Sequence, residues 1–193
     1  MKSFQEYERL AEAAHGHICA GQILGLRMAL FGLRLLGLDE RAGTDRKRLV
    51  TFVEIDRCVT DAVSVVTGCR LGKRALKFRD FGKVAATFCD LQAGKAVRVI
   101  ARASARERAR QMHPEIEGAK QQQSAAYREM PDEELFDYRW GRVRIAPQDL
   151  PGYKAPKAVC GECGEEISFG REVPRDDRTL CRGCAGEQYF EPL

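Results

Sequence analysis

The sequence predicts an α+β fold: a mixed helix and sheet core domain, followed by a small zinc-finger module of treble-clef or ribbon-like type. Three observations predict it. Apolar residues recur at helical spacing near the N-terminus, β-prone segments separated by turn residues follow, and two Cys-x2-Cys pairs lie near the C-terminus. With 193 residues, 44% of them hydrophobic, the chain can form one ordinary domain and a small satellite.

Two helices are predicted at the N-terminus. In residues 3–14, apolar side chains recur three and four positions apart, and Gly16 is a natural end for that helix. A second, more apolar helix is predicted over residues 20–36, with Gly37 as its end. Small residues four positions apart form a stripe on this second helix, where another backbone can approach closely. The stripe consists of Gly21, Gly25 and Ala29.

Four segments are predicted to be strands. Residues 49–55 are β-prone, and residues 84–90 and 96–101 read as a hairpin because a turn with Gly94 joins them. A final strand is predicted over residues 140–145. The stretch between the first strand and the hairpin carries turn signals at its glycines, and no strand is predicted there.

Shorter helices are predicted around these strands. An apolar segment, 61–68, follows the first strand with Thr60 as a candidate N-cap. Residues 104–107, Ser-Ala-Arg-Glu, form a capping-box pattern that opens another helix, and this helix ends before the next proline. Helical sequence continues over 115–129, and Pro131 starts a short helix.

A domain boundary is predicted at residues 147–156, PQDLPGYKAP, which hold three of the seven prolines. Such a segment is semi-rigid and does not pair into a sheet easily. We therefore expect a core domain with the candidate cleft site at 1–146, a proline-rich linker at 147–156 and a zinc finger at 157–193.

The chain shows no sign of a membrane span or a secretory signal. Its start, MKSFQEYERL, lacks the apolar region that a secretory signal carries. Residues 18–38 are apolar over a membrane length, but Arg27 and Arg34 interrupt them and would make a span costly. We expect a buried helix there and a cytoplasmic protein, whose eight cysteines are thiols and metal ligands rather than disulfides.

The C-terminal region carries the strongest motif. It reads CGEC, then seventeen residues, then CRGC. Each two-residue spacer turns both thiolates toward one ion, and four thiolates complete the tetrahedron of a structural zinc. The ligands are Cys160, Cys163, Cys181 and Cys184. A pair of redox dithiols is the alternative. The module resembles zinc fingers of the DksA/TraR type of transcription factor, which fits a protein contact as well as a nucleic-acid contact.

A second candidate site lies in HGHIC, where His15, His17 and Cys19 occupy alternate positions. In an extended chain alternate residues share one face, whereas in a helix His17 would point away from the other two. The spacing therefore suits three ligands if the chain unwinds at Gly16, which places Cys19 beside a helix N-terminus that favours its thiolate. Cys58, just after the first strand, is a fourth candidate. The alternative is a histidine helix cap beside a core cysteine.

Two other cysteines are expected to have packing roles. Cys69 follows a glycine at a turn, and Cys89 alternates with an aromatic residue in a predicted strand. A free cysteine in such a position usually behaves as a small hydrophobic side chain.

Four motifs in order, HGHICAGQILGLRMA, EIDRCVTDAV, TGCRLGKRAL and DFGKVAATF, resemble the FmdE-like family, named after the E subunit of formylmethanofuran dehydrogenase. The resemblance implies an α+β core, a cleft with the His-x-His-x-Cys element, often a C-terminal zinc finger, and a homodimer. It also implies functional positions, with two accessory groups at the end of this list: His15, His17, Cys19, Cys58, Asp61 and Lys83.

The predicted function is that of a metal-binding protein with an accessory or redox and metal-handling role. The cofactors are a structural zinc in the finger and a second transition metal, zinc among the candidates, in the cleft. The cleft could instead hold a reactive thiol, and its catalytic candidates are Cys19, Cys58 and His17. The chain lacks an iron–sulfur cysteine run, a dinucleotide fingerprint and a P-loop, so it cannot carry out formyl-transferring redox chemistry alone.

The expected partners are a second copy of the chain and a protein that contacts the finger. The rival function is a non-catalytic regulator, in which the finger contacts nucleic acid or protein and the core senses a ligand. The net charge of +4 is mild and falls short of the clustered Lys and Arg of nucleic-acid-binding domains. Nucleic acid is therefore not the expected partner.

Overall fold

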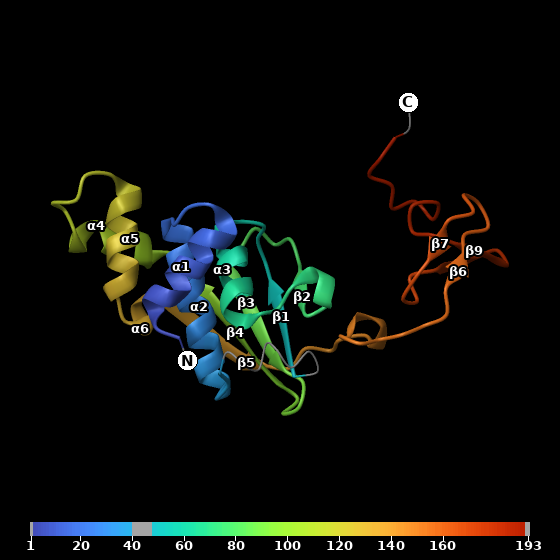
Figure 1. The fold of residues 1–193 in the computed structure, drawn as a ribbon, viewed down its shortest axis with the longest axis horizontal. Helices are drawn as coiled ribbons and strands as arrows, with labels where there is room; N and C mark the ends of the chain where they lie inside the picture. Colours follow the sequence, from blue (N-terminus) through green and yellow to red (C-terminus); the bar gives the residue numbers. More distant parts are fainter. Residues whose placement is uncertain (1, 40–47, 192–193) are drawn as a thin grey trace. The chain divides into compact units, whose positions relative to one another are not determined.

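A five-stranded sheet organises the N-terminal part of the computed structural model, which describes residues 2–39 and 48–191 (Figure 1). The spatial order is β2-β1-β3-β4-β5, with β1 and β2 parallel and all other neighbours antiparallel. The strands are β1 (Leu49–Val53), β2 (Leu76–Phe78), β3 (Ala85–Asp90), β4 (Lys95–Ala101) and β5 (Phe136–Gly141).

The helices complete a mixed α+β core, as predicted. They are α1 (Phe4–His15), α2 (Ala20–Leu36), α3 (Cys58–Thr67), α4 (Ser104–Met112), α5 (Ala119–Glu129) and α6 (Asp132–Leu135). Helix α2 packs on β3 and β4, α3 packs along α2, and α5 lies against both α2 and α4 (Figure 1). Within the described residues, none of the helices has the length and apolar character that a membrane crossing requires.

Glycines on α2 allow its neighbours to approach closely. A Cβ on Gly25 would lie 2.6 Å from the carbonyl oxygen of Val59 in α3, and a Cβ on Gly32 would lie 2.3 Å from the ring of Phe88 in β3. Both spaces are too small for a side chain. The predicted small-residue stripe is therefore a contact surface with α3, and Gly32 adds a contact with the sheet that was not predicted.

Two predicted helix caps are wrong. The helix after β1 begins at Cys58 with Arg57 as its N-cap, and Thr60 lies inside it. Thr60 instead donates its hydroxyl to the carbonyl of Ile55. At α4, Ala103 already has helical backbone angles, so Ser104 is the first helical residue and caps nothing.

A capping box is present in α1, where none was predicted. The Ser3 hydroxyl accepts a hydrogen bond from the Glu6 amide at 3.2 Å, and the Glu6 carboxylate accepts one from the Ser3 amide at 2.7 Å. These two bonds satisfy amides that the first turn of a helix leaves without partners.

Three further elements differ from the prediction. The last strand is β5, at 136–141 rather than 140–145, because its register against β4 runs from Phe136 opposite Ala101 to Gly141 opposite Ala96. Strand β2 has no counterpart in the prediction, because it is only three residues long. Helix α5 begins at Ala119, after the positive-φ Gly118, and not at 115.

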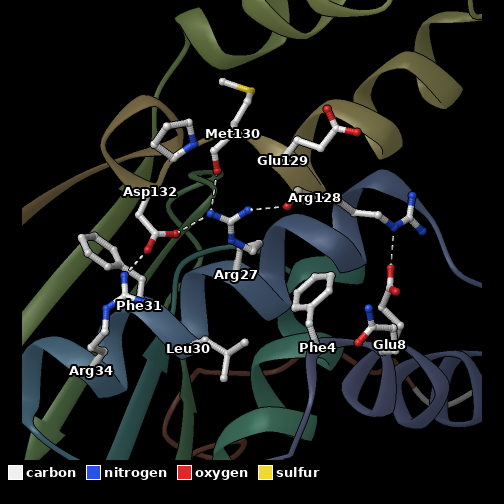
Figure 2. A pocket seen from close by; sticks show the side chains of 12 residues that line it. Phe4, Glu8, Arg27, Leu30, Phe31, Arg34, Arg128, Glu129, Met130 and Asp132 are labelled. Carbon is white, nitrogen blue, oxygen red and sulfur yellow. Dashed lines mark hydrogen bonds and ion pairs between the residues drawn. The ribbon is translucent and has the colours of Figure 1, made fainter.

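Arg27 of α2 holds the end of α5 in place (Figure 2). Its guanidinium donates to one carboxylate oxygen of Asp132 at 2.8 Å, and it also donates to three backbone carbonyls, those of Tyr127, Arg128 and Met130. Tyr127 and Arg128 lie in the last turn of α5 and Met130 is its C-cap, so no amide within the helix reaches these carbonyls. Arg27 therefore fixes α5 against α2.

The described chain divides into two units, Met1–Arg144 and Ile145–Leu193. The second unit contains two short hairpins, and its strands are β6 (Ala158–Val159), β7 (Glu166–Ile167), β8 (Val173–Arg175) and β9 (Arg178–Leu180). Cys160, Ile167 and Leu180 form its small core. The finer division into a linker at 147–156 and a finger at 157–193 stays a prediction, and residues 192–193 lie outside the described part.

Candidate functional site

A cavity of about 790 Å³ lies beside the N-terminal ends of α2 and α3. One wall is formed by residues 17–21 and Cys58. Ile116 and the face of α5 that carries Lys120, Gln123 and Ser124 form the opposite wall. A cavity of this size can hold a small organic molecule, because ligand pockets usually measure about 300–1,000 Å³.

The chain between α1 and α2 is unwound, as the histidine and cysteine spacing predicted. Helix α1 ends at His15, and Gly16 adopts the left-handed conformation with φ of 91°, donating its amide to Glu12 at 2.7 Å. The following residues stay non-helical until α2 begins at Ala20. One continuous helix, the geometry that would have separated His17 from Cys19, is therefore not formed.

Cys19 and Cys58 meet at the ends of two neighbouring helices. Cys19 is the N-cap of α2, and Cys58 is the first residue of α3. Gly21 lies between them: a Cβ there would be 3.4 Å from the Cys58 Cβ and 3.7 Å from the Cys19 Sγ. Helix N-termini carry partial positive charge, which favours thiolates and anions at this position.

The two thiols also influence one another. Burial raises the pKa of Cys58 above its ordinary value, and a hydrogen bond with the Cys19 side chain raises it further. A nearby negative charge on Cys19 would make a second thiolate unfavourable. Without a cation, the pair therefore retains a proton at neutral pH, and a bound metal ion would supply the missing positive charge.

The two histidines play different parts. His15 Nδ1 lies 2.8 Å from a carboxylate oxygen of Asp61 in α3, so the carboxylate orients the imidazole and leaves its Nε2 uncommitted. The His17 ring lies 4.9 Å from the His15 ring, centroid to centroid, and His17 lines the cavity. His15 does not line it.

Of the two predicted accessory groups, Asp61 and Lys83, only Asp61 contacts the candidate site residues, through its hydrogen bond with His15. The Lys83 ammonium lies 6.0 Å from the centre of the Phe81 ring, and Lys83 is not one of the residues that line the cavity. Cys69 and Cys89 are buried, as predicted.

Among the described residues, one group of three or more His, Cys, Asp or Glu has ligand atoms that all lie within 4.8 Å of one another. It consists of Cys160, Cys163, Cys181 and Cys184. No three of the cleft candidates come that close, so the cleft metal site stays a prediction while the predicted four-cysteine cluster is confirmed.

The cluster fits a divalent cation. Backbone amides donate to the Cys160 thiolate, that of Cys181 at 3.2 Å, and they lower the pKa of Cys160 to about 6. Hydrogen bonding with Cys181 raises the pKa of Cys184. Four thiolates this close repel one another, so some must hold protons unless a cation binds. Cysteine ligands in this number and spacing suit zinc.

The wall formed by α5 was missed in the sequence. Lys120, Gln123 and Ser124 belong to a polar stretch, AKQQQSAAYRE, that resembles any solvent-facing helix. The unusual glutamine run gave no indication of a ligand. The packing of α5 against α2 brings these side chains to the cavity.

Comparison with known proteins identifies the family and the fold. The family described as "FmdE, Molybdenum formylmethanofuran dehydrogenase operon" matches residues 14–137. The chain is similar in fold to a tungsten formylmethanofuran dehydrogenase FmdE-like protein from Syntrophus aciditrophicus, with a TM-score of 0.64 and 20% identity over 98% of this chain and 96% of that one.

A curated relative matches over a shorter stretch. A probable S-adenosyl-L-methionine-binding protein from Archaeoglobus fulgidus is 40% identical over 90 residues, which are 46% of this chain and 25% of that protein. The chain thus matches about a quarter of the relative's length. The FmdE family match, in contrast, spans the histidines, both cleft cysteines and the whole sheet through the start of β5. The chain belongs to the FmdE family.

Proposed function

We propose that this FmdE-family protein is a metal-binding accessory protein with two distinct sites. The four-cysteine cluster holds a structural zinc, and the cleft at Cys19 and Cys58 holds a second transition metal or a reactive thiol. One observation carries the second part: two cysteines from different helices meet on the wall of a cavity of about 790 Å³.

The chemistry of the cleft residues supports a metal with an open coordination position. Two thiolates and the imidazole of His17 would make a three-ligand set, which is the number that catalytic zinc sites usually keep. The fourth position would face the cavity. The Asp61–His15 pair resembles the carboxylate–histidine arrangement that orients a metal ligand, so His15 either ligates through Nε2 or positions its neighbour.

The cavity also suggests a substrate class. Its walls combine apolar side chains, such as Ile18 and Ile116, with amide and hydroxyl groups from α5. We propose that it admits a small organic molecule with both apolar and polar parts. S-adenosyl-L-methionine, from the name of the A. fulgidus relative, is the first compound to test by calorimetry.

The finger is more suited to a protein contact than to nucleic acid. Residues 157–193 hold five Lys or Arg and eight Asp or Glu, whereas nucleic-acid-binding modules concentrate positive charge. We therefore favour the accessory role over a regulator that binds nucleic acid through the finger. A homodimer and a cytoplasmic location remain predictions of the sequence.

Metal content tests the proposal. Purified protein should hold two metal ions per chain, and Cys160→Ser should lose one together with the folding of the finger. Cys19→Ala/Cys58→Ala should lose the other and keep a folded core and finger. Cys69→Ala/Cys89→Ala is the matched control, since both residues are buried away from the cleft, and it should keep both ions. If the cleft double variant retains two ions, the second site is disproved.

A further inference from the structure

We propose that Cys19 and Cys58, when no metal ion holds them, form a thiol–disulfide pair that exchanges with low-molecular-weight disulfides. The inference rests on the cleft of the proposed function and adds an activity to it. It names the chemical class of the co-reactant, a small organic disulfide, and the two residues that react with it.

The first argument is proximity. The Cys58 Cβ and the Cys19 Sγ both lie within 4 Å of the one point where Gly21 would carry a side chain, and Gly21 has none. The Cys19 side chain is also close enough to raise the pKa of Cys58, after the larger effect of burial. Two cysteines that share so small a volume can join with little movement of the helices that carry them.

The second argument is access. Both thiols are half-buried and line a cavity that can admit a small molecule, whereas Cys69 and Cys89 are buried and line none of the described cavities. A disulfide must reach the attacking sulfur along the S–S axis, so only cysteines on an open cavity wall can react in the folded protein. Cys19 is the N-cap of α2 with an extended backbone, whereas Cys58 is already the first helical residue of α3.

The reaction balances without any further reagent. The Cys19 sulfur attacks one sulfur of the small disulfide, that S–S bond breaks, and the released thiolate takes a proton from solvent. Cys58 then attacks the Cys19 sulfur of the mixed disulfide, forms the Cys19–Cys58 bond and releases the second small thiol. Two protein thiols lose two electrons and two protons, and the small disulfide gains them.

Glutathione disulfide is the probe for the test. Full-length, metal-free protein is incubated with it, free thiols are trapped with N-ethylmaleimide, and tryptic peptides are identified by mass spectrometry. Trypsin releases Cys19 in residues 10–27 and Cys58 in residues 58–70. For the peptides that carry Cys19 and Cys58, the expected product is one cross-linked pair, lighter by two hydrogen atoms than the separate peptides and free of glutathione; the four finger cysteines lie in other peptides and are scored separately. Fragmentation should assign the bond to Cys58 and not to Cys69.

Matched variants check the order of the steps. Cys58→Ala cannot resolve the intermediate, so it should accumulate the Cys19–glutathione mixed disulfide, which the wild type should not. Cys89→Ala should behave as the wild type. A stable glutathione adduct on wild-type Cys19, a bond to Cys69, or no reaction at Cys19 would overturn the proposal.

The outcome separates this inference from the proposed metal site. If the cleft binds a metal ion but the metal-free protein forms no Cys19–Cys58 bond, the exchange activity fails and the metal site stands. If the bond forms but the cleft cysteines contribute nothing to metal content, the metal role fails and the exchange activity stands. Prior loading of the cleft with zinc should protect both thiols from glutathione disulfide when both proposals hold.

Discussion

Individual cysteines in this protein differ mainly in what surrounds them. Cys19 and Cys58 lie at the N-termini of two helices beside a cavity, while Cys69 accepts a hydrogen bond from the Thr51 hydroxyl within the core. Cys89 lies in β3 and is 4% exposed. Burial therefore distinguishes two kinds of cysteine. The half-buried ones beside the cavity are candidate site residues, and the fully buried ones have a packing role.

Native-state alkylation should separate these classes. Burial raises the pKa of Cys89 from 9.0 to about 12, so at pH 8 the thiolate fraction of Cys89 falls about a thousandfold below that of an unperturbed thiol. Burial also raises the pKa of Cys69. Iodoacetamide should modify Cys19 in folded, metal-free protein and leave Cys69 and Cys89 unmodified until denaturant is added. Equal rates at Cys19 and Cys89 would contradict this assignment.

A second residue-scale feature is the ion pair on the sheet. Arg98 of β4 donates through Nε and Nη2 to the two carboxylate oxygens of Glu54, at 2.6 and 2.7 Å, and Glu54 is 5% exposed. Such a bidentate pair gives the buried carboxylate its counter-charge. The side chain of Arg98 is partly exposed, so solvent screens part of the interaction.

Arg98→Met should lower the free energy of unfolding by about 2–3 kcal/mol, because it leaves the buried Glu54 carboxylate without a counter-charge. Urea denaturation measures this. Arg102→Met, which breaks the exposed pair with Asp137, is the control and should change stability little. If the two variants unfold at the same urea concentration, the buried pair is not a stabilising feature.

At the scale of elements, long and periodic segments could be predicted and short ones could not. Helix α2 was placed at its observed bounds because seventeen residues of apolar pattern and a terminal Gly37 define it. Strand β2 has only three residues and forms its ladder hydrogen bonds with β1. It is too short to show the alternation of apolar and polar residues that predicts a strand. The predicted caps at Thr60 and Ser104 were wrong because the first residue of a helix depends on backbone angles that tertiary packing sets, not on the local sequence alone.

The contact of α2 with α3 is tested by two glycine substitutions on the same helix. Gly25→Ala places a methyl group against the α3 backbone, whereas Gly21→Ala places one at ordinary contact distance from its neighbours. The gain in helix propensity is similar for both and largely cancels in the comparison. Gly25→Ala should therefore be less stable than Gly21→Ala by about 1–3 kcal/mol. Thermal and urea unfolding measure the difference, and equal stabilities would contradict the close packing.

At the scale of the whole molecule, two walls from distant parts of the chain enclose the cleft. The residues of only one wall could be predicted from the sequence. The wall with His17, Cys19 and Cys58 carries residue types whose chemistry is visible in sequence. The α5 wall consists of ordinary polar residues, and it reaches the site because Arg27 binds the last turn of α5 (Figure 2). Its place depends on a contact between residues about a hundred positions apart, which a single sequence does not reveal.

Arg27→Met should loosen that wall. The substitution removes four hydrogen bonds to the end of α5 and to Asp132, while it keeps an apolar stem of similar length. Amide hydrogen exchange should become faster in α5 than in the wild type and stay unchanged in β3 and β4, which α5 does not cover. Unchanged exchange in α5 would show that the helix is held by other contacts.

The central claim, a cleft site distinct from the zinc finger, is tested most directly by locating the metals. Anomalous diffraction at the zinc edge, from crystals of purified protein supplied with zinc, should show two peaks for each chain. One peak should lie among Cys160, Cys163, Cys181 and Cys184, and the other should lie against Cys19 and Cys58 with an imidazole of the His15–His17 segment. A single peak, confined to the finger, would contradict the claim and leave the cleft cysteines without a metal.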